Sequence, residues 1–143
     1  MDPTRAAELR TAWAARHRPD EAPSPAAAAA VERLLGERVP EPEAAAAILD
    51  AEGRRRVAAL AGGALYLVWA VPGGAGTPEA ARVRRIPLAA AEVELSERAE
   101  GSARVRHWWF EVGEEPLVFR TLDAADEAFA AALAAAVGWP PVG

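Results

Sequence analysis

The sequence predicts an α+β protein in which two N-terminal helices precede an antiparallel sheet of about six or seven strands and one further helix closes the chain. Three observations lead to this prediction. Apolar residues recur at helical spacing near both ends, polar and apolar residues alternate through the middle, and glycine-rich turns separate the alternating runs. Helices and strands do not alternate as in βαβ units, so a parallel sheet is not expected.

The chain opens with a helix. Asp2 followed by Pro3 is typical of an N-cap with proline at the first helical position. Leu9 and Trp13 lie four residues apart and therefore on one face. Residues 19–25 contain three prolines and form a linker, because proline cannot continue a helix. We expect this helix to dock on the rest of the protein; the alternative is that it is offered to a partner.

A second helix begins at Ser24, an N-cap that proline follows. It turns Val31 and Leu35 inward and is expected to end at Gly36. Residues 44–50 fit two structures. Their alanine run favours a helix by propensity, whereas Ile-Leu before Asp-Ala-Glu-Gly is also typical of a strand that enters a hairpin turn.

The pattern changes to strands from residue 54 onward. Gly62-Gly63 separates two apolar runs and suits a tight two-residue hairpin. Residues 72–81 are rich in glycine and proline and form a loop. The predicted strands are residues 56–60, 64–71, 82–86, 93–97, 103–112 and 117–120.

The last element is an amphipathic helix whose apolar face is broader than that of the opening helix. Asp123 with Asp126 three residues later can cap its start, and Gly138 with the prolines that follow ends it. Its apolar positions recur at helical spacing. They are Leu122, Phe129, Leu133 and Val137.

Four short segments have a recognisable order. The chain carries GERV at 36–39, EG at 52–53, ALYL at 64–67 and RIPL at 85–88, the last running on to Val93. Together with the closing helix, these segments resemble small actinobacterial proteins of the pleckstrin-homology-like type. One departure is that those proteins often have tryptophan where this chain has leucine after the RIP triplet.

The resemblance covers residues 36–138 and implies a bent antiparallel sheet whose open corner is plugged by the last helix. It divides the chain into a helical attachment, residues 1–35, and a pleckstrin-homology-like domain, residues 36–143. It also favours a strand at residues 44–50. The fold is mainly a binding and scaffolding platform, so the resemblance brings no catalytic residues.

Composition restricts the function further. The 143 residues carry a net charge of −5, which argues against a dedicated nucleic-acid binder. There is no cysteine, and every basic side chain other than histidine is arginine, with no lysine, asparagine or glutamine. That bias indicates a high-GC genome, an actinobacterial one by expectation. No segment reads as a membrane span or signal peptide, so we expect a cytoplasmic protein.

Catalytic and metal-binding patterns are not found. His17 and His107 are far apart in the sequence and form no histidine pair at a helical spacing. No serine lies in a nucleophile elbow. The glycine-rich residues 73–77 lack the Gly-Lys-Ser/Thr ending of a phosphate-binding loop. We therefore expect no enzyme activity, no metal and no cofactor.

Two groups of arginines are candidates for anion or lipid binding. Arg54, Arg55 and Arg56 follow a glycine turn, and Arg82 and Arg84 lie on one face of a predicted strand. Each arginine near an anionic membrane contributes about 1 kcal/mol, so such binding is weak. A solvated strand edge is the alternative interpretation, and weak binding to lipid head groups is the alternative function.

The leading function is protein interaction or scaffolding. Trp108, Trp109 and Phe110 are consecutive strand residues, so the two tryptophans face opposite sides. One of them lies on the outer face, either under the N-terminal helices or as a contact for another protein or a second copy, as in a homodimer. Trp13 on the opening helix is a further interaction candidate.

Overall fold

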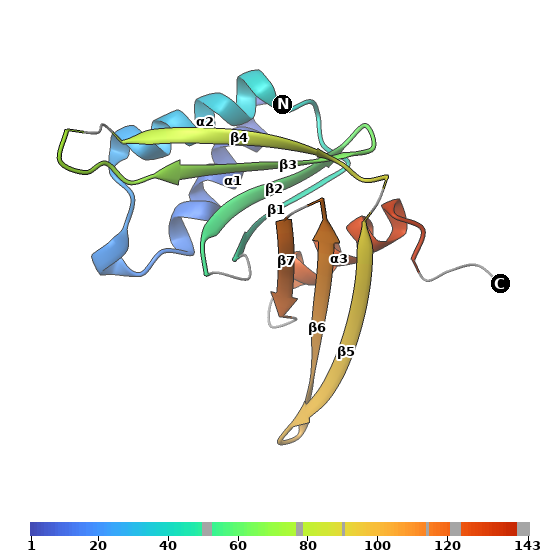
Figure 1. Ribbon diagram of the computed structural model, residues 1–143. Helices are drawn as coiled ribbons and strands as arrows, with labels where there is room; N and C mark the ends of the chain where they lie inside the picture. The colour runs from blue at the N-terminus through green and yellow to red at the C-terminus, as the bar shows by residue number, and fades with distance from the viewer. Residues whose placement is uncertain (50–52, 77–78, 90, 114, 121–123, 140–143) are drawn as a thin grey trace.

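The computed structural model describes residues 1–143 except 50–52, 77–78, 90, 114, 121–123 and 140–143. Within these residues two helices precede seven antiparallel strands and a C-terminal helix, which confirms the predicted α+β order (Figure 1). The elements are α1 (Pro3–Ala15), the 3₁₀ turn η1 (Pro19–Glu21), α2 (Pro25–Arg38), β1 (Ala44–Leu49), β2 (Arg55–Ala61), β3 (Ala64–Val71), β4 (Ala80–Pro87), β5 (Glu92–Glu100), β6 (Ala103–Val112), β7 (Glu115–Arg120) and α3 (Ala124–Ala136).

The strands form two sheets, which corrects the expectation of one continuous bent sheet. β1-β2-β3-β4 make the first sheet and β5-β6-β7 the second, each in sequence order. The change of sheet occurs after β4, where the Leu88 amide donates to the Gly63 carbonyl and the Leu88 carbonyl accepts from Ala91. This turn carries the chain out of the first sheet, so β5 pairs with β6 instead of β4.

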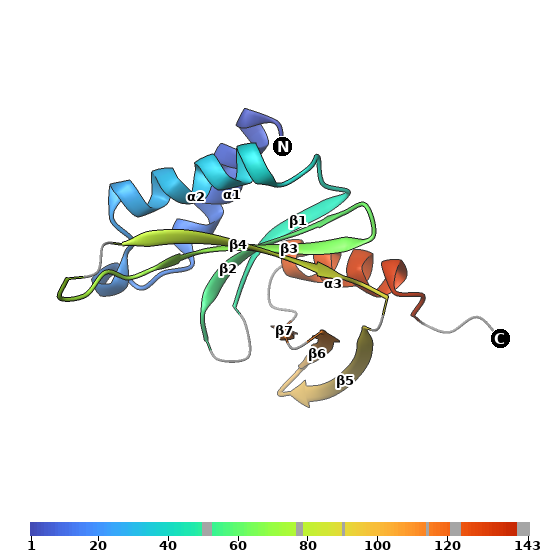
Figure 2. The same ribbon diagram turned by 45° about the horizontal axis from the view of Figure 1, so that its top comes forward.

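The first sheet is the middle layer of the protein. α1 and α2 cover one of its faces, while the second sheet and α3 lie on the other side (Figures 1 and 2). Successive strand residues alternate between these layers. Val57 and Val68 pack under the two helices, and Leu65 and Leu67 pack toward α3 and the second sheet.

The opening helix docks on the sheet, as expected. It turns Ala6, Leu9 and Trp13 into the core that α1, α2 and the first sheet share. α2 crosses the boundary expected between residues 35 and 36, and its Val31 and Leu35 are fully buried in the same core. The two helices are therefore packed against the sheet along their length.

The predicted end of α2 at Gly36 is wrong, because the helix continues to Arg38. Gly36 lies on the exposed side, where a missing side chain loses no packing. Leu35 and Val39 lie four positions apart, so one more turn of helix brings Val39 into the core. Burial of Val39 outweighs the roughly 1 kcal/mol that glycine costs inside a helix.

The alanine run at 44–50 is strand β1 over Ala44–Leu49, in register with β2 from the Ala44–Leu60 pair onward; Asp50 lies outside the described residues. Neighbouring alanines are buried on opposite faces, Ala46 in one core and Ala47 in the other. A strand buries both, whereas a single docked helix face would not.

Two further predictions concern the hairpin between β2 and β3 and the closing helix α3. Gly62 and Gly63 have φ of +56° and +72° and join β2 to β3, which confirms the tight hairpin. The predicted cap at Asp123 and the apolar Leu122 lie outside the described residues. Phe129 and Leu133 of α3 are buried, as expected.

Candidate protein-interaction surface

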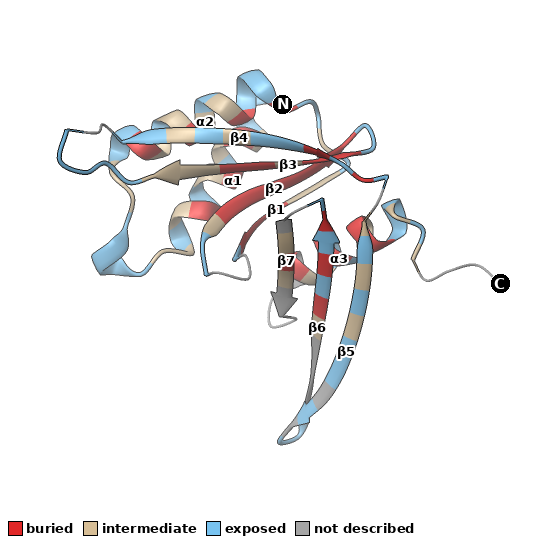
Figure 3. Cartoon of the chain, viewed as in Figure 1, coloured by how far each residue is buried: buried red, intermediate tan, exposed pale blue. Residues whose placement is uncertain are grey.

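β6 places consecutive aromatic residues on opposite faces of the second sheet. Trp108 is 5% exposed and Phe110 is fully buried, whereas Trp109 is 41% exposed. Figure 3 shows the resulting alternation of buried and exposed positions along this strand. The prediction that one tryptophan faces outward is therefore confirmed, and that residue is Trp109.

Trp108 and Phe110 belong to the core between the second sheet and α3. Their rings are stacked with centroids 5.9 Å apart, and the Trp139 ring meets Trp108 edge-on at 5.0 Å. The Trp108 Nε1–H donates to Glu127 Oε2 of α3 at 3.1 Å. A buried indole needs such a partner, so these two candidates serve the interior of the protein.

Trp109 lies in the middle strand of its sheet with a neighbour on each side. Glu94 of β5 and Val118 of β7 are its cross-strand partners. Its Nε1–H donates to Glu111 Oε1 at 3.4 Å, which is long for a hydrogen bond. At this end of the second sheet, we give the name Trp109 face to the described side chains that point outward. They are Glu92, Glu94, Trp109, Glu111, Pro116 and Val118.

The Trp109 face is strongly acidic. Glu92 stands directly opposite Glu111, and Glu94, the next residue of β5 on the same face, stands opposite Trp109. All three carboxylates are exposed, and in the described part of the chain none has a cationic partner. Like charges directly opposite each other on neighbouring strands are destabilising. The arrangement therefore favours a cation from outside this surface.

No described helix covers this face. α1 and α2 dock on the far side of the first sheet, and α3 packs on the inner side of the second (Figure 2). The N-terminal helices therefore do not cover Trp109, which was one of the two alternatives for the exposed tryptophan. Trp13 of α1 is instead 1% exposed, and its Nε1–H donates to the Arg55 carbonyl at 3.1 Å.

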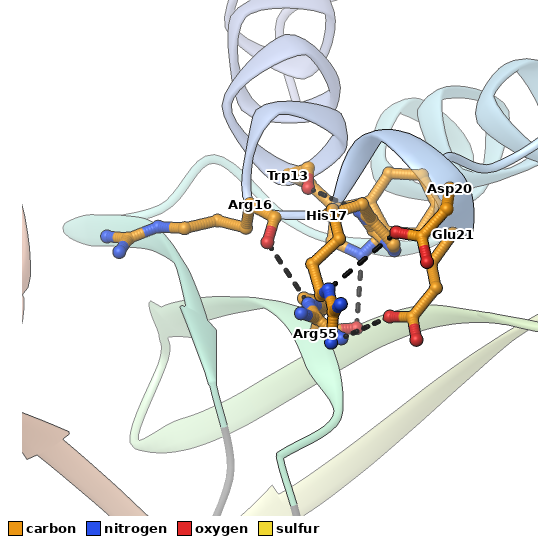
Figure 4. A network of polar contacts seen from close by, with 7 residues as sticks. Trp13, Arg16, His17, Asp20, Glu21 and Arg55 are labelled. Carbon is orange, nitrogen blue, oxygen red and sulfur yellow. Dashed lines mark hydrogen bonds and ion pairs between the residues drawn. The ribbon is translucent and has the colours of Figure 1, made fainter.

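The three consecutive arginines have three different surroundings. Arg54 is exposed. Arg55 is held by the end of α1 and by η1, because its Nε–H donates to the Arg16 carbonyl at 3.1 Å and its guanidinium lies 3.4 Å from Glu21 (Figure 4). Arg56 is 1% exposed and lies over the Trp69 ring, 4.3 Å from its centroid. They do not form one basic patch.

Arg54 and Arg55 do line an open cleft of about 670 Å³. Trp69 provides an aromatic wall, and Glu21 and Glu79 contribute negative charge. The cleft lies where η1 passes the ends of β2 and β3, so the N-terminal segment forms part of its rim. It has the size of a small-ligand site, with mixed charge.

The second arginine group lies on β4, an edge strand of the first sheet. Arg82 stands opposite Trp69 and Arg84 opposite Leu67, which confirms that these two share a face. Arg85 points to the other face, opposite Tyr66. All three are exposed, and we call the two that share a face, Arg82 and Arg84, the β4 arginine strip.

The carboxylates of the Trp109 face are site residues that sequence reasoning missed. Glu92 and Glu94 look like the solvated side of an alternating strand. The only signal in the sequence is that they are two residues apart and therefore share a face. Their position beside Trp109 depends on the pairing of β5 with β6, which a single sequence does not fix.

Other chemistry is limited. Among the residues that the structure describes, no three histidine, cysteine or acidic side chains come together in a way that could hold a metal ion. The described helices include none that combines the length and the apolar character of a membrane span. The candidate surface is accordingly defined by its exposed aromatic and its charges.

Comparison with known proteins adds no relative. No protein-family model matches the chain, and neither a curated protein nor a solved structure gives a significant match.

Proposed function

We propose that the protein is a non-enzymatic protein-interaction or scaffolding module that binds its partner through the Trp109 face. The observation that supports this proposal is an indole that is 41% exposed in the middle strand of a sheet. Tryptophan is enriched among the residues that dominate binding energies. A large aromatic held rigidly by strand pairing also loses little side-chain entropy on binding.

The surroundings of Trp109 support the same function. Val118 and Pro116 are half-buried apolar neighbours, and three exposed carboxylates frame the patch. An apolar centre with a charged rim is the usual anatomy of a protein interface. The aromatic supplies the affinity, and the charges restrict which partners fit.

Native mass spectrometry of protein purified gently from its host tests this function. Trp109→Ala is compared with Leu49→Ala, because Leu49 is 42% exposed on β1 and therefore matches Trp109 in exposure but lies on the other sheet. We expect added mass on the wild type and on Leu49→Ala, and its loss from Trp109→Ala. Equal retention by all three proteins, or a wild type without added mass, contradicts the proposal.

We also infer that the fold is a variant of the actinobacterial pleckstrin-homology-like type. The run of antiparallel strands followed by one helix supports this inference, as do Phe129 and Leu133, which fill the core beside both sheets. The acidic, cysteine-free composition supports a cytoplasmic location.

A second candidate function is weak binding of anionic lipid head groups. The cleft lined by Arg54 and Arg55 favours it, because an anion there meets two guanidinium groups beside an aromatic wall. Binding to vesicles of phosphatidylglycerol in phosphatidylcholine tests this function. Arg54→Glu is compared with Arg38→Glu on α2, a control variant of the same net charge. We expect binding that falls steeply with salt and that only Arg54→Glu abolishes; no binding at low salt rules this function out.

A further inference from the structure

Two exposed surfaces of opposite charge lie on different sheets of this chain. The Trp109 face carries Glu92, Glu94 and Glu111 on the second sheet. The β4 arginine strip lies at the edge of the first sheet. Within the described residues the three carboxylates contact no cation of their own chain. A partner that binds this face is therefore expected to carry positive charge.

A symmetric contact between two Trp109 faces does not meet this need. It brings the carboxylates of both copies together around the two indoles, and like charges across an interface are strongly unfavourable. The same reasoning applies to two β4 strips. A contact between copies that satisfies the charges therefore joins one kind of surface to the other.

The spacing of the charges agrees with such a contact. Glu92 and Glu94 are two residues apart on β5, and Arg82 and Arg84 are two residues apart on β4. Residues at this separation on a strand lie roughly 6.6–6.8 Å apart along it. The two acidic and the two basic side chains thus have the same repeat, and both ion pairs can form in one register.

We propose that the Trp109 face binds the β4 arginine strip of a second copy of this chain, with a guanidinium seated over the Trp109 ring. An exposed indole attracts a cation on its face, and arginine is the commonest cation in such pairs. This inference rests on the proposed function, since it identifies the partner of the same face. The two surfaces differ, so the contact is head-to-tail and extends into a ring or an open chain.

Sedimentation equilibrium of the purified protein over a range of concentrations tests the inference. We expect the weight-average mass to rise with concentration at low salt and to fall toward the monomer at about 0.5 M salt, where surface charges are screened. Trp109→Ala is expected to weaken the association roughly two- to thirtyfold, the worth of one cation–π contact.

Variants with reversed charges provide the decisive experiment. Glu92→Arg with Glu94→Arg reverses the acidic face, and Arg82→Glu with Arg84→Glu reverses the strip. Each double variant alone is expected to remain monomeric, because its two surfaces then carry the same sign, while an equimolar mixture associates again. The control for the face variant is Glu8→Arg with Glu37→Arg, which changes the net charge by the same amount at exposed helix positions and is expected to self-associate like the wild type.

The outcomes separate the two proposals. A wild type that stays monomeric at every concentration and at low salt overturns the second-copy inference, as does self-association that neither double reversal disturbs. Loss of self-association by the control variant, to the same extent as by the face variant, also overturns it, because the loss then follows the net charge and not the position of the charges. Binding of another protein through Trp109 is decided independently by the host co-purification experiment.

Discussion

Two adjacent tryptophans of β6 serve opposite sides of the second sheet. Trp108 is enclosed by Phe110, Trp139 and Glu127, and Trp109 faces solvent beside three carboxylates. The alternation of a strand predicts that their environments differ. Which of the two is buried follows only from the pairing with β5 and β7, because that pairing decides which face meets α3.

The two tryptophans are expected to differ in their effect on stability. Trp108→Ala removes a buried ring and should lower the free energy of unfolding by about 3–5 kcal/mol. Trp109→Ala changes a surface position and should shift it by no more than about 0.5 kcal/mol. Urea unfolding followed by circular dichroism measures both. Equal losses would show that the Trp109 side chain is part of the core.

The arginines at 54–56 show the limit of prediction for single residues. Their adjacency in sequence suggests one patch, yet Arg55 is held by Glu21 and Arg56 lies over Trp69. Both partners come from other elements, and no pattern in the local sequence indicates them. Only Arg54 of the three is exposed, as a solvent-facing charge is expected to be.

Among the helices and strands, burial overrides the local propensity of the sequence at two places. The alanines of β1 favour a helix, but the strand buries Ala46 and Ala47 in two different cores. Gly36 favours the end of α2, but burial of Val39 extends the helix. In both cases packing against the first sheet decides the structure, and that sheet is made of residues distant in sequence.

Glycine substitutions in two elements should change stability in opposite directions. Gly36→Ala lies within α2, where no atom beyond the neighbouring residues and the backbone of the same helix lies within 4 Å of an added Cβ, and is expected to stabilise the protein by about 0.5–1 kcal/mol. Gly63→Ala lies at φ +72° in the β2–β3 hairpin and is expected to destabilise it by about 1–2 kcal/mol. Thermal unfolding of both variants decides the signs; a destabilising Gly36→Ala would mean that α2 ends earlier.

At the scale of the whole molecule, an ion pair connects the end of the first helix to the last helix. Arg16 follows α1 and lies 2.7 Å from Asp126 of α3, whose side chain is almost buried. The sequence predicts α1 and α3 separately but gives no sign that their ends meet. Their meeting depends on β1, which packs against both helices.

Removing this link is expected to be costly. Asp126→Ala leaves the guanidinium of Arg16 without this carboxylate in a partly buried site, and we expect a loss of about 1–3 kcal/mol. Arg10→Ala is the control, because its pair with Glu32 on α2 is much more exposed and is worth about 1 kcal/mol or less. Urea midpoints of the two variants test the difference, and equal midpoints would contradict the structural role given to Asp126.

The order of elements, the hairpin at Gly62 and Gly63, and the outward tryptophan could all be predicted from the sequence. The division into two sheets could not, because the turn at Leu88 depends on a hydrogen bond to Gly63. The acidic partners of Trp109 likewise depend on strand register. Local periodicity fixes the elements, whereas long-range pairing fixes the site.

The position of α3 between the two sheets also has a consequence for synthesis on the ribosome. α1, α2 and the first four strands emerge first and can close the core under the helices. The opposite side of the same sheet, with Leu65 and Leu67, stays open until Phe129 and Leu133 arrive. At roughly 5–20 residues per second, the nascent chain shows this apolar surface for several seconds. During that interval we expect chaperones that bind exposed apolar surface to contact it.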